Sequence, residues 1–227
     1  MKIKYVTLLW LSWICLLPLS SLAQNSDAGA WYIYFGNQKI APRWNWWNEV
    51  QYRNFNLAGD LEQLLLRTAI GYSLKDLAHN LQLGYAFILS EPYTPGTSLK
   101  TRTIEHRLYQ QFLTRQTIGR LVLQHRYRLE ERFLPNRFRL RARYFLSANI
   151  PLNKPAMGKG VAYLSAYNEV FLHLDRPVFD RNRLYGGAGI GITDYLRIET
   201  GWMYQILENT YRPQWQVMLF STFPLKK

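Results

Sequence analysis

Hydrophobic and polar residues alternate along most of the chain after residue 30, and no segment shows the 3.6-residue spacing of a helix. The clearest run covers 138–150, where the even positions are apolar and the odd positions begin with Arg139, Arg141 and Arg143. Similar two-faced runs cover 64–73, 81–89 and 121–130. These runs exceed the ~5–6 residues that are usual in soluble sandwiches and suit tilted strands that cross a bilayer.

The pattern therefore predicts an all-β protein, an up-and-down antiparallel transmembrane β-barrel of about 10–12 strands. The candidate strands lie near 30–38, 44–54, 63–73, 81–90, 102–113, 119–132, 137–150, 160–173, 182–193, 195–207 and 213–223. Bacterial barrels normally have an even number of strands, so this set indicates that one candidate is wrong or that a terminal strand is missing. The weakest candidate is the first, "AWYIYFGNQ", next to a short turn that contains Pro42.

The connections between the candidate strands fall into two groups. With the C-terminus on the periplasmic side, we expect the outward group to be 55–62, 91–101, 133–136, 174–181 and 208–212. The periplasmic group is then 74–80, 114–118, 151–159 and 193–194. This assignment puts the longest polar connection, "EPYTPGTSLKT", outside, as is typical of barrels with short periplasmic turns.

The composition favours the same interpretation. A mean hydropathy of −0.23 excludes a helical membrane protein, whereas an aromatic content of 15% is high for a soluble domain. Tyrosine and tryptophan near strand ends are typical of the interfacial girdles of membrane barrels. The candidate girdle residues are Trp31, Trp44, Trp46, Trp202, Tyr204 and Trp215.

The first 23 residues are predicted to be a signal peptide. Lys2 and Lys4 form a basic start, an apolar stretch runs over 5–19, and Ser21-Leu22-Ala23 is a small-x-small cleavage site. A retained signal anchor is the alternative, but Pro18 interrupts the run and it is shorter than a spanning helix. We therefore expect cleavage near Ala23 and an outer-membrane barrel domain over 24–227.

Cysteine and charge narrow the chemistry further. The single cysteine, Cys15, lies in the predicted signal peptide, so the sequence predicts no disulfide, thiol nucleophile or cysteine-ligated metal in the barrel. Lys and Arg number 28 against 15 acidic residues, which raises the question of nucleic acid. However, the lysines lie in turns and termini, whereas most arginines lie inside alternating segments. This separation indicates a charged barrel interior and no nucleic-acid partner.

A charge network in the lumen is the candidate site. Its predicted members are Glu49, Arg53, Arg67, Glu105, Arg107, Arg126, Arg128, Glu130, Arg139, Arg141, Arg143, Glu169, Arg197 and Glu199. A tight hairpin across "FLPNR" would bring Glu130 near Arg139, Arg128 near Arg141, and Arg126 near Arg143. Like charges that face each other are destabilising, so we expect acids from other strands to neutralise them. Two interpretations remain open, a salt-bridged plug of side chains and a narrow passage for small anions.

Catalysis has weaker support in the sequence. No GxSxG, HExxH, phosphate-binding loop or metal-ligand cluster occurs, so no cofactor and no metal are predicted. His106 and His125 could pair across their hairpin, and His79 lies in a predicted turn. His173, near Asp175 and Asp180 in a predicted outer loop, is the best acid–base candidate. An envelope lipid-modifying enzyme is therefore the alternative function, and a protein without catalytic activity is favoured.

Four segments resemble those of a known family: "HRYRLEERF", "RFRLRARYFL", "YNEVFLHL" and "FDRNRLYGGAGIGI". Together they are similar to an uncharacterised outer-membrane β-barrel family of Gram-negative bacteria, catalogued as a domain of unknown function. The resemblance covers nearly the whole mature chain and implies a membrane barrel, with no established activity or substrate. The chain departs from the family pattern at Arg181 and in the tail after the last aromatic residue, Phe223.

The sequence thus predicts a small, porin-like barrel of the bacterial outer membrane with an arginine- and glutamate-rich lumen, plugged or narrow. Its expected roles are structural support, binding at the outer loops, or restricted passage of small anions. The expected partners are outer-membrane lipids, lipopolysaccharide, the barrel assembly machinery and small anions.

Overall fold

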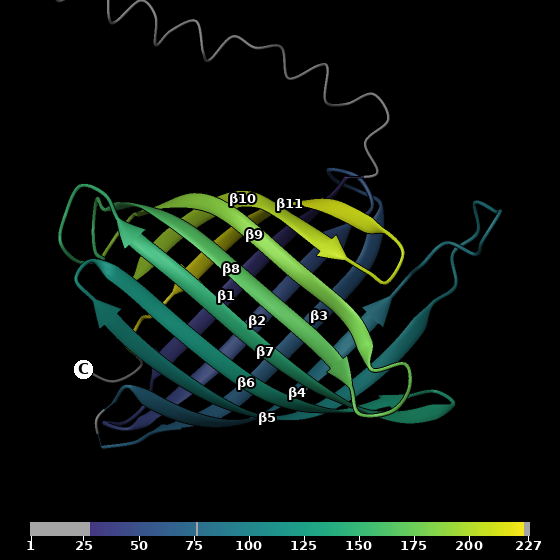
Figure 1. Ribbon diagram of the computed structural model, residues 1–227, viewed down its shortest axis with the longest axis horizontal. Helices are drawn as coiled ribbons and strands as arrows, with labels where there is room; N and C mark the ends of the chain where they lie inside the picture. Colours follow the sequence, from purple (N-terminus) through teal and green to yellow (C-terminus); the bar gives the residue numbers. More distant parts are fainter. Residues whose placement is uncertain (1–27, 76, 225–227) are drawn as a thin grey trace, which may run out of the picture.

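The computed structural model describes residues 28–75 and 77–224, which form one closed β-barrel (Figure 1). The predicted signal peptide lies outside the described residues. The strands are β1 (Gly29–Lys39), β2 (Trp44–Asn54), β3 (Leu61–Ser73), β4 (His79–Ser90), β5 (Thr103–Ile118), β6 (Leu121–Leu134), β7 (Arg137–Pro151), β8 (Ala162–His173), β9 (Phe179–Gly191), β10 (Leu196–Ile206) and β11 (Tyr211–Ser221). Each pairs antiparallel with its neighbours in the sequence, which confirms the predicted all-β, largely up-and-down barrel. No helix long and apolar enough to cross a membrane occurs in these two ranges.

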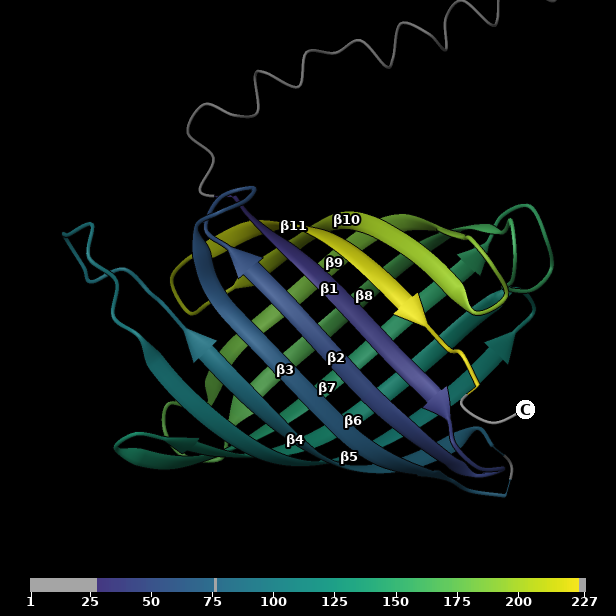
Figure 2. The same cartoon turned by 180° about the vertical axis from the view of Figure 1, so that it is seen from behind.

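The barrel closes through a parallel pair, and this corrects the expectation of an even strand number. β1 runs parallel to β11, with Gly29 opposite Gln214 and Gly36 opposite Ser221 (Figure 2). The first candidate strand, considered the weakest, is therefore a full member of the wall. A parallel closing pair lets an odd number of strands form a closed sheet, and we call this pair the seam.

The connections gather at two ends, grouped as the sequence predicted. Those after β2, β4, β6, β8 and β10 lie at one end, the loop end, and those after β1, β3, β5, β7 and β9 lie at the other, the turn end. One predicted turn is wrong, because β5 continues through 114–118 to Ile118 and pairs there with Leu121.

The β6–β7 hairpin has a different register from the predicted one. Only two residues, 135 and 136, connect the strands, and Leu134 pairs with Arg137. Glu130 therefore lies opposite Arg141, not Arg139, and Arg128 lies opposite Arg143, not Arg141. Arg126 lies opposite Phe145. The shift of two residues keeps every side chain on its predicted face, so Glu130 still lies opposite an arginine and Arg128 still faces another arginine.

Alternate residues of each strand point into the lumen or away from it, and the two faces have opposite chemistry. On β6 and β7 the inward residues Arg128, Glu130 and Arg141 are only 1–3% exposed. The outward neighbours Tyr127 and Leu129 are 50% and 37% exposed. Charge is thus buried inside the barrel, and apolar side chains cover its outer wall.

Apolar side chains fill part of the lumen beside the charges. One cluster spans the seam and contains Trp31, Ile33, Tyr185, Met203 and Met218, and the other contains Leu65, Ala69, Ala86, Ile88 and Tyr109. Trp31 was expected in an interfacial girdle, but it is 3% exposed and lies inside, against the guanidinium group of Arg53 at 3.7 Å. The sequence did not show which face of β1 points inward, because both faces carry aromatic residues. Trp44, Trp46, Trp202 and Tyr204 do point outward and are exposed.

Glycines make room for large inward rings. A Cβ atom at Gly84 would overlap the ring of Tyr109, and one at Gly189 would overlap the ring of Tyr163. Both tyrosines are fully buried. The glycine-rich segment of β9 therefore admits bulky neighbours to the lumen.

Candidate functional site

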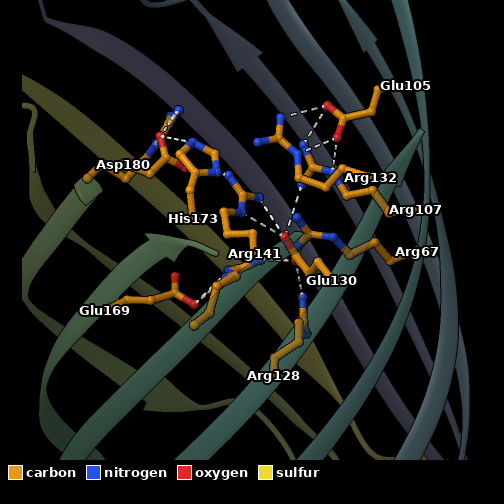
Figure 3. Close-up of polar contacts among 12 residues, drawn as sticks. Arg67, Glu105, Arg107, Arg128, Glu130, Arg132, Arg141, Glu169, His173 and Asp180 are labelled. Carbon is orange, nitrogen blue, oxygen red and sulfur yellow. Dashed lines mark hydrogen bonds and ion pairs between the residues drawn. The ribbon is translucent and has the colours of Figure 1, made fainter. Parts of the chain in front are cut away.

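Glu130 is the centre of the charge network in the lumen (Figure 3). Its carboxylate accepts hydrogen bonds from Arg141, whose Nη2 and Nε lie 2.6 and 3.0 Å from Oε2. Arg143 donates to Oε1, and Arg128 lies 3.4 Å from the same oxygen. Arg107 adds a longer ion pair of 3.7 Å. One fully buried carboxylate therefore neutralises guanidinium groups from three strands.

Glu105 forms a second centre on β5. It receives two hydrogen bonds from Arg107, at 2.6 and 2.8 Å, and two from Arg132, at 2.6 and 3.1 Å. Because Arg107 also pairs with Glu130, this centre and the first are continuous.

Glu169 on β8 extends the network across the lumen. Arg143 and Arg126 donate to its Oε1 at 2.6 and 2.7 Å, and Arg183 lies 3.9 Å from Oε2. Arg143 bridges Glu169 and Glu130, so the walls formed by β6, β7 and β8 are linked by shared arginines. Shared charge-assisted hydrogen bonds of this kind offset much of the desolvation cost of buried ions.

The wall formed by β2 and β3 has a smaller cluster. Arg67 donates to Glu49 at 2.6 Å, and both side chains are nearly inaccessible. Among the described residues, Arg53 donates no hydrogen bond to a carboxylate. Its partners are the amide oxygens of Gln51 and Gln63. Amides thus replace acids as the partners of this arginine.

Asp180 closes the network toward the loop end. Arg141 donates to Oδ2 at 2.6 Å, and Arg181 donates to Oδ1 at 3.0 Å. The Nε2 atom of His173 lies 3.8 Å from Oδ1. His173 is the last residue of β8, as the candidate strand over 160–173 predicted, and it is buried. Arg141 therefore binds acids of two strands, β6 and β9.

Three predicted members lie outside this network. Arg139 pairs with the exposed Asp175 at 2.9 Å, and Glu199 accepts a hydrogen bond from Tyr163 at 2.9 Å. Arg197 has no carboxylate partner among the residues that the structure describes. Its guanidinium carbon lies 4.1 Å from the ring centre of Phe220 and 5.6 Å from that of Tyr163.

The sequence interpretation missed Arg132, Arg183 and Asp180 as members. Arg132 has the same parity as Arg128 and Glu130, so that signal was present. Asp180 was assigned to a loop, because the β9 candidate began three residues too late.

Aromatic rings contact several arginines of the network, in which arginines outnumber acidic residues. The ring of Phe171 lies within 4.3–5.2 Å of the guanidinium carbons of Arg141, Arg143 and Arg183. Phe171 is 2% exposed. Cation–π contacts strengthen when they are desolvated, so this ring stabilises positive charge at the point where several arginines converge.

The predicted pairing of two histidines across the β5–β6 hairpin is wrong. His106 and His125 do not pair, because the β5–β6 register puts His106 opposite Phe133 and His125 opposite Thr114. Each instead contacts a tyrosine hydroxyl, Tyr85 at 2.6 Å and Tyr144 at 2.8 Å. In the described ranges, no group of three His, Cys, Asp or Glu side chains could hold a metal ion.

At the loop end, an ion pair joins the β4–β5 connection to the β2–β3 connection. Lys100 pairs with Asp60 and also donates to the carbonyl of Leu61 at 2.7 Å. Partial burial would raise the pKa of Asp60, but hydrogen bonds from Lys100 and Tyr93 outweigh it and hold that pKa below its ordinary value. Asp60 therefore stays ionised and fixes the long connection.

Two cavities lie in the lumen, one toward the turn end and one near the middle of the strands. The larger, about 610 Å³, opens at the turn end, and we call it the vestibule. The smaller, about 110 Å³, lies deeper and is lined by members of the charge network, including Glu49, Arg67 and Glu169. Arg126 and Arg197 line both cavities, so the two adjoin at these side chains.

A family model matches residues 28–216, which is nearly the whole barrel, and it is described as "Protein of unknown function (DUF2490)". No curated protein and no solved structure matches the chain.

Proposed function

Because the chain belongs to the DUF2490 family, whose description assigns no activity, we propose from the fold that it is a bacterial outer-membrane barrel whose lumen is closed by the Arg/Glu network. Its role is structural or ligand-binding in the envelope. Its partners are outer-membrane lipids, lipopolysaccharide and, during insertion, the barrel assembly machinery.

The observation that carries the proposal is the inverted distribution of polarity. Soluble proteins rarely expose a continuous apolar surface of more than a few hundred Å². Here outward residues in the middle of neighbouring strands are exposed and apolar, among them Val50, Leu66, Leu83, Leu108 and Leu129. The inward residues of the same strands include the buried Arg67 and Glu130. This arrangement suits a wall whose outer solvent is hydrocarbon.

Fractionation tests the location. We expect the mature chain in the outer-membrane fraction, resistant to extraction by carbonate, and with a folded form that migrates differently from the boiled form on a gel. Recovery in the soluble periplasmic fraction would overturn the membrane proposal.

The lumen contacts favour a closed barrel over an open channel. The carboxylates of Glu130, Glu105 and Glu169 bridge side chains of β5, β6, β7, β8 and β9, and Trp31 with its cluster fills the space beside β1. Opening a path for ions would separate buried charges from their partners, which costs several kcal/mol for each pair.

We therefore expect no steady conductance when the purified protein is inserted into planar bilayers. Restricted anion passage is the second candidate, because arginines outnumber acids in the lumen, and it predicts a small anion-selective current. A steady cation-selective current would contradict both candidates. A matched recording of an open porin in the same lipid controls for insertion.

A further inference from the structure

The vestibule has the size and lining of a ligand site. Its volume of about 610 Å³ lies within the range of small-molecule sites, roughly 300–1,000 Å³. Side-chain amides from neighbouring strands line it, including Asn45, Asn80, Gln82, Gln111 and Gln124. The rings of Phe35, Trp47 and Phe220 complete the wall. Amides can both donate and accept hydrogen bonds, and rings offer apolar faces, so this lining suits a polar organic molecule.

The charge of this lining is positive. Arg115, Arg120 and Arg197 line the vestibule, and none of them is bonded to a carboxylate among the described residues. Arg115 donates to the amide oxygen of Gln124 at 2.9 Å, and Arg120 donates to backbone carbonyls. Among the described residues that line the vestibule, the one acidic side chain is that of Asp194, which lies at the rim.

The inner cavity provides a second, independent observation. Its buried walls include donors that have no hydrogen-bond partner among the protein atoms: Nε of Arg67, Nε of Arg126 and Nε2 of Gln216. Arg67 and Gln216 are 7% and 1% exposed. One buried acceptor in this cavity, Oε2 of Glu49, is also unpaired. Buried polar atoms normally have partners, and this excess of donors favours a ligand group that carries several acceptor oxygens.

We propose that the vestibule binds a small organic anion from the turn end, with its phosphate or carboxylate group held by Arg126 and Arg197 where the two cavities adjoin. The amides and rings of the vestibule contact the rest of the molecule. Glu169 lines the inner cavity, and its ion pairs together with those of Glu130 close the lumen there. The site is thus a pocket with one opening, and its ligand does not pass through the barrel.

Calorimetric titration of the full mature chain, folded in detergent, tests this proposal at constant ionic strength. The probes are glucose 1-phosphate, glucuronate and neutral glucose. We expect at least one of the two anions to bind and glucose to bind much more weakly. Comparison of the two anions identifies the preferred group, and inorganic phosphate shows what the anionic group contributes alone.

The variants locate the site. Arg197→Gln should weaken anion binding about tenfold or more, since a hydrogen bond to a charged group contributes about 1.5–3 kcal/mol. Arg115→Gln is a second variant in the vestibule. Arg115 is exposed, so its replacement does not disturb the packing around Phe220. The control is Arg102→Gln, which removes the same charge from an exposed ion pair with Glu91 at the loop end.

Three results would overturn the proposal: no binding of either anion, equal binding of glucose, or equal losses in Arg197→Gln and Arg102→Gln. The test is separate from that of the closed lumen. A barrel that conducts ions would contradict the closed lumen, and with it the single opening of the pocket, but not the binding that these titrations measure. A closed barrel that binds no anion would contradict this inference alone.

Discussion

Replacing Glu130 by Gln is expected to lower the free energy of unfolding by about 3–5 kcal/mol, the usual cost of removing one partner from a buried ion pair. The amide keeps the size of the side chain but leaves Arg141, Arg143 and Arg128 without the negative charge that they share. Denaturant titration of the folded barrel in lipid, followed by the gel shift of the folded form, measures the loss.

Two variants serve as controls for Glu130→Gln. Asp175→Asn makes the same chemical change beside another arginine, Arg139, but in an exposed pair, so the unfolding midpoint should hardly move. Arg128→Gln should also be milder than Glu130→Gln, because Glu130 keeps its other arginines and Nη2 of Arg128 has no partner. If Arg128→Gln destabilised the barrel more than Glu130→Gln, the carboxylate would not be the centre of the network.

Replacing Leu66 by Arg is expected to destabilise the barrel in a bilayer by roughly 2–4 kcal/mol, the cost of arginine on a lipid-facing wall near the midplane. Leu66 lies at the middle of β3, is 42% exposed, and pairs with Val50 and Phe87 on the outer face. Refolding into lipid vesicles over a denaturant series measures the effect.

The matched control is Leu99→Arg, in the β4–β5 connection. Leu99 is 70% exposed but lies outside the strands, so the same substitution should leave stability nearly unchanged. Equal effects at Leu66 and Leu99, or an effect of Leu66→Arg that is as large in a polar solvent as in lipid, would contradict a lipid-facing wall.

The faces of the strands could be predicted from the sequence, but their pairing could not. Two-residue periodicity places Arg141 and Arg143 on one face whatever strand lies beside them, and both are inside. A register shift of two residues leaves that periodicity unchanged, so the partner of Glu130 depended on a turn of only two residues. Partners on non-adjacent strands, such as Glu169 for Arg126, depend on the curvature of the closed wall, which local pattern does not encode.

The other differences between prediction and structure arose where the alternation of apolar and polar residues gives no information. Both faces of β1 are aromatic or apolar, so the sequence could not show that Trp31 lies inside or that β1 completes the barrel. Arg197 shares the parity of the network, yet it lies beside Phe220 and the vestibule. Parity gives the face of a residue but not its depth along the lumen.

The seam also has a consequence for the order of folding. Each antiparallel pair joins strands that are close in the sequence, whereas Gly29 pairs with Gln214, a residue near the other end of the described chain. The entropy lost on closing a loop grows by ~0.6 kcal/mol with each doubling of its length, so the seam has the highest closure cost of any strand pair. The cluster of Trp31, Tyr185 and Met218 spans it and can assemble only when β1 meets β11. We therefore expect this cluster to form late and slowly during folding, and we expect the seam to be the first place where the wall separates.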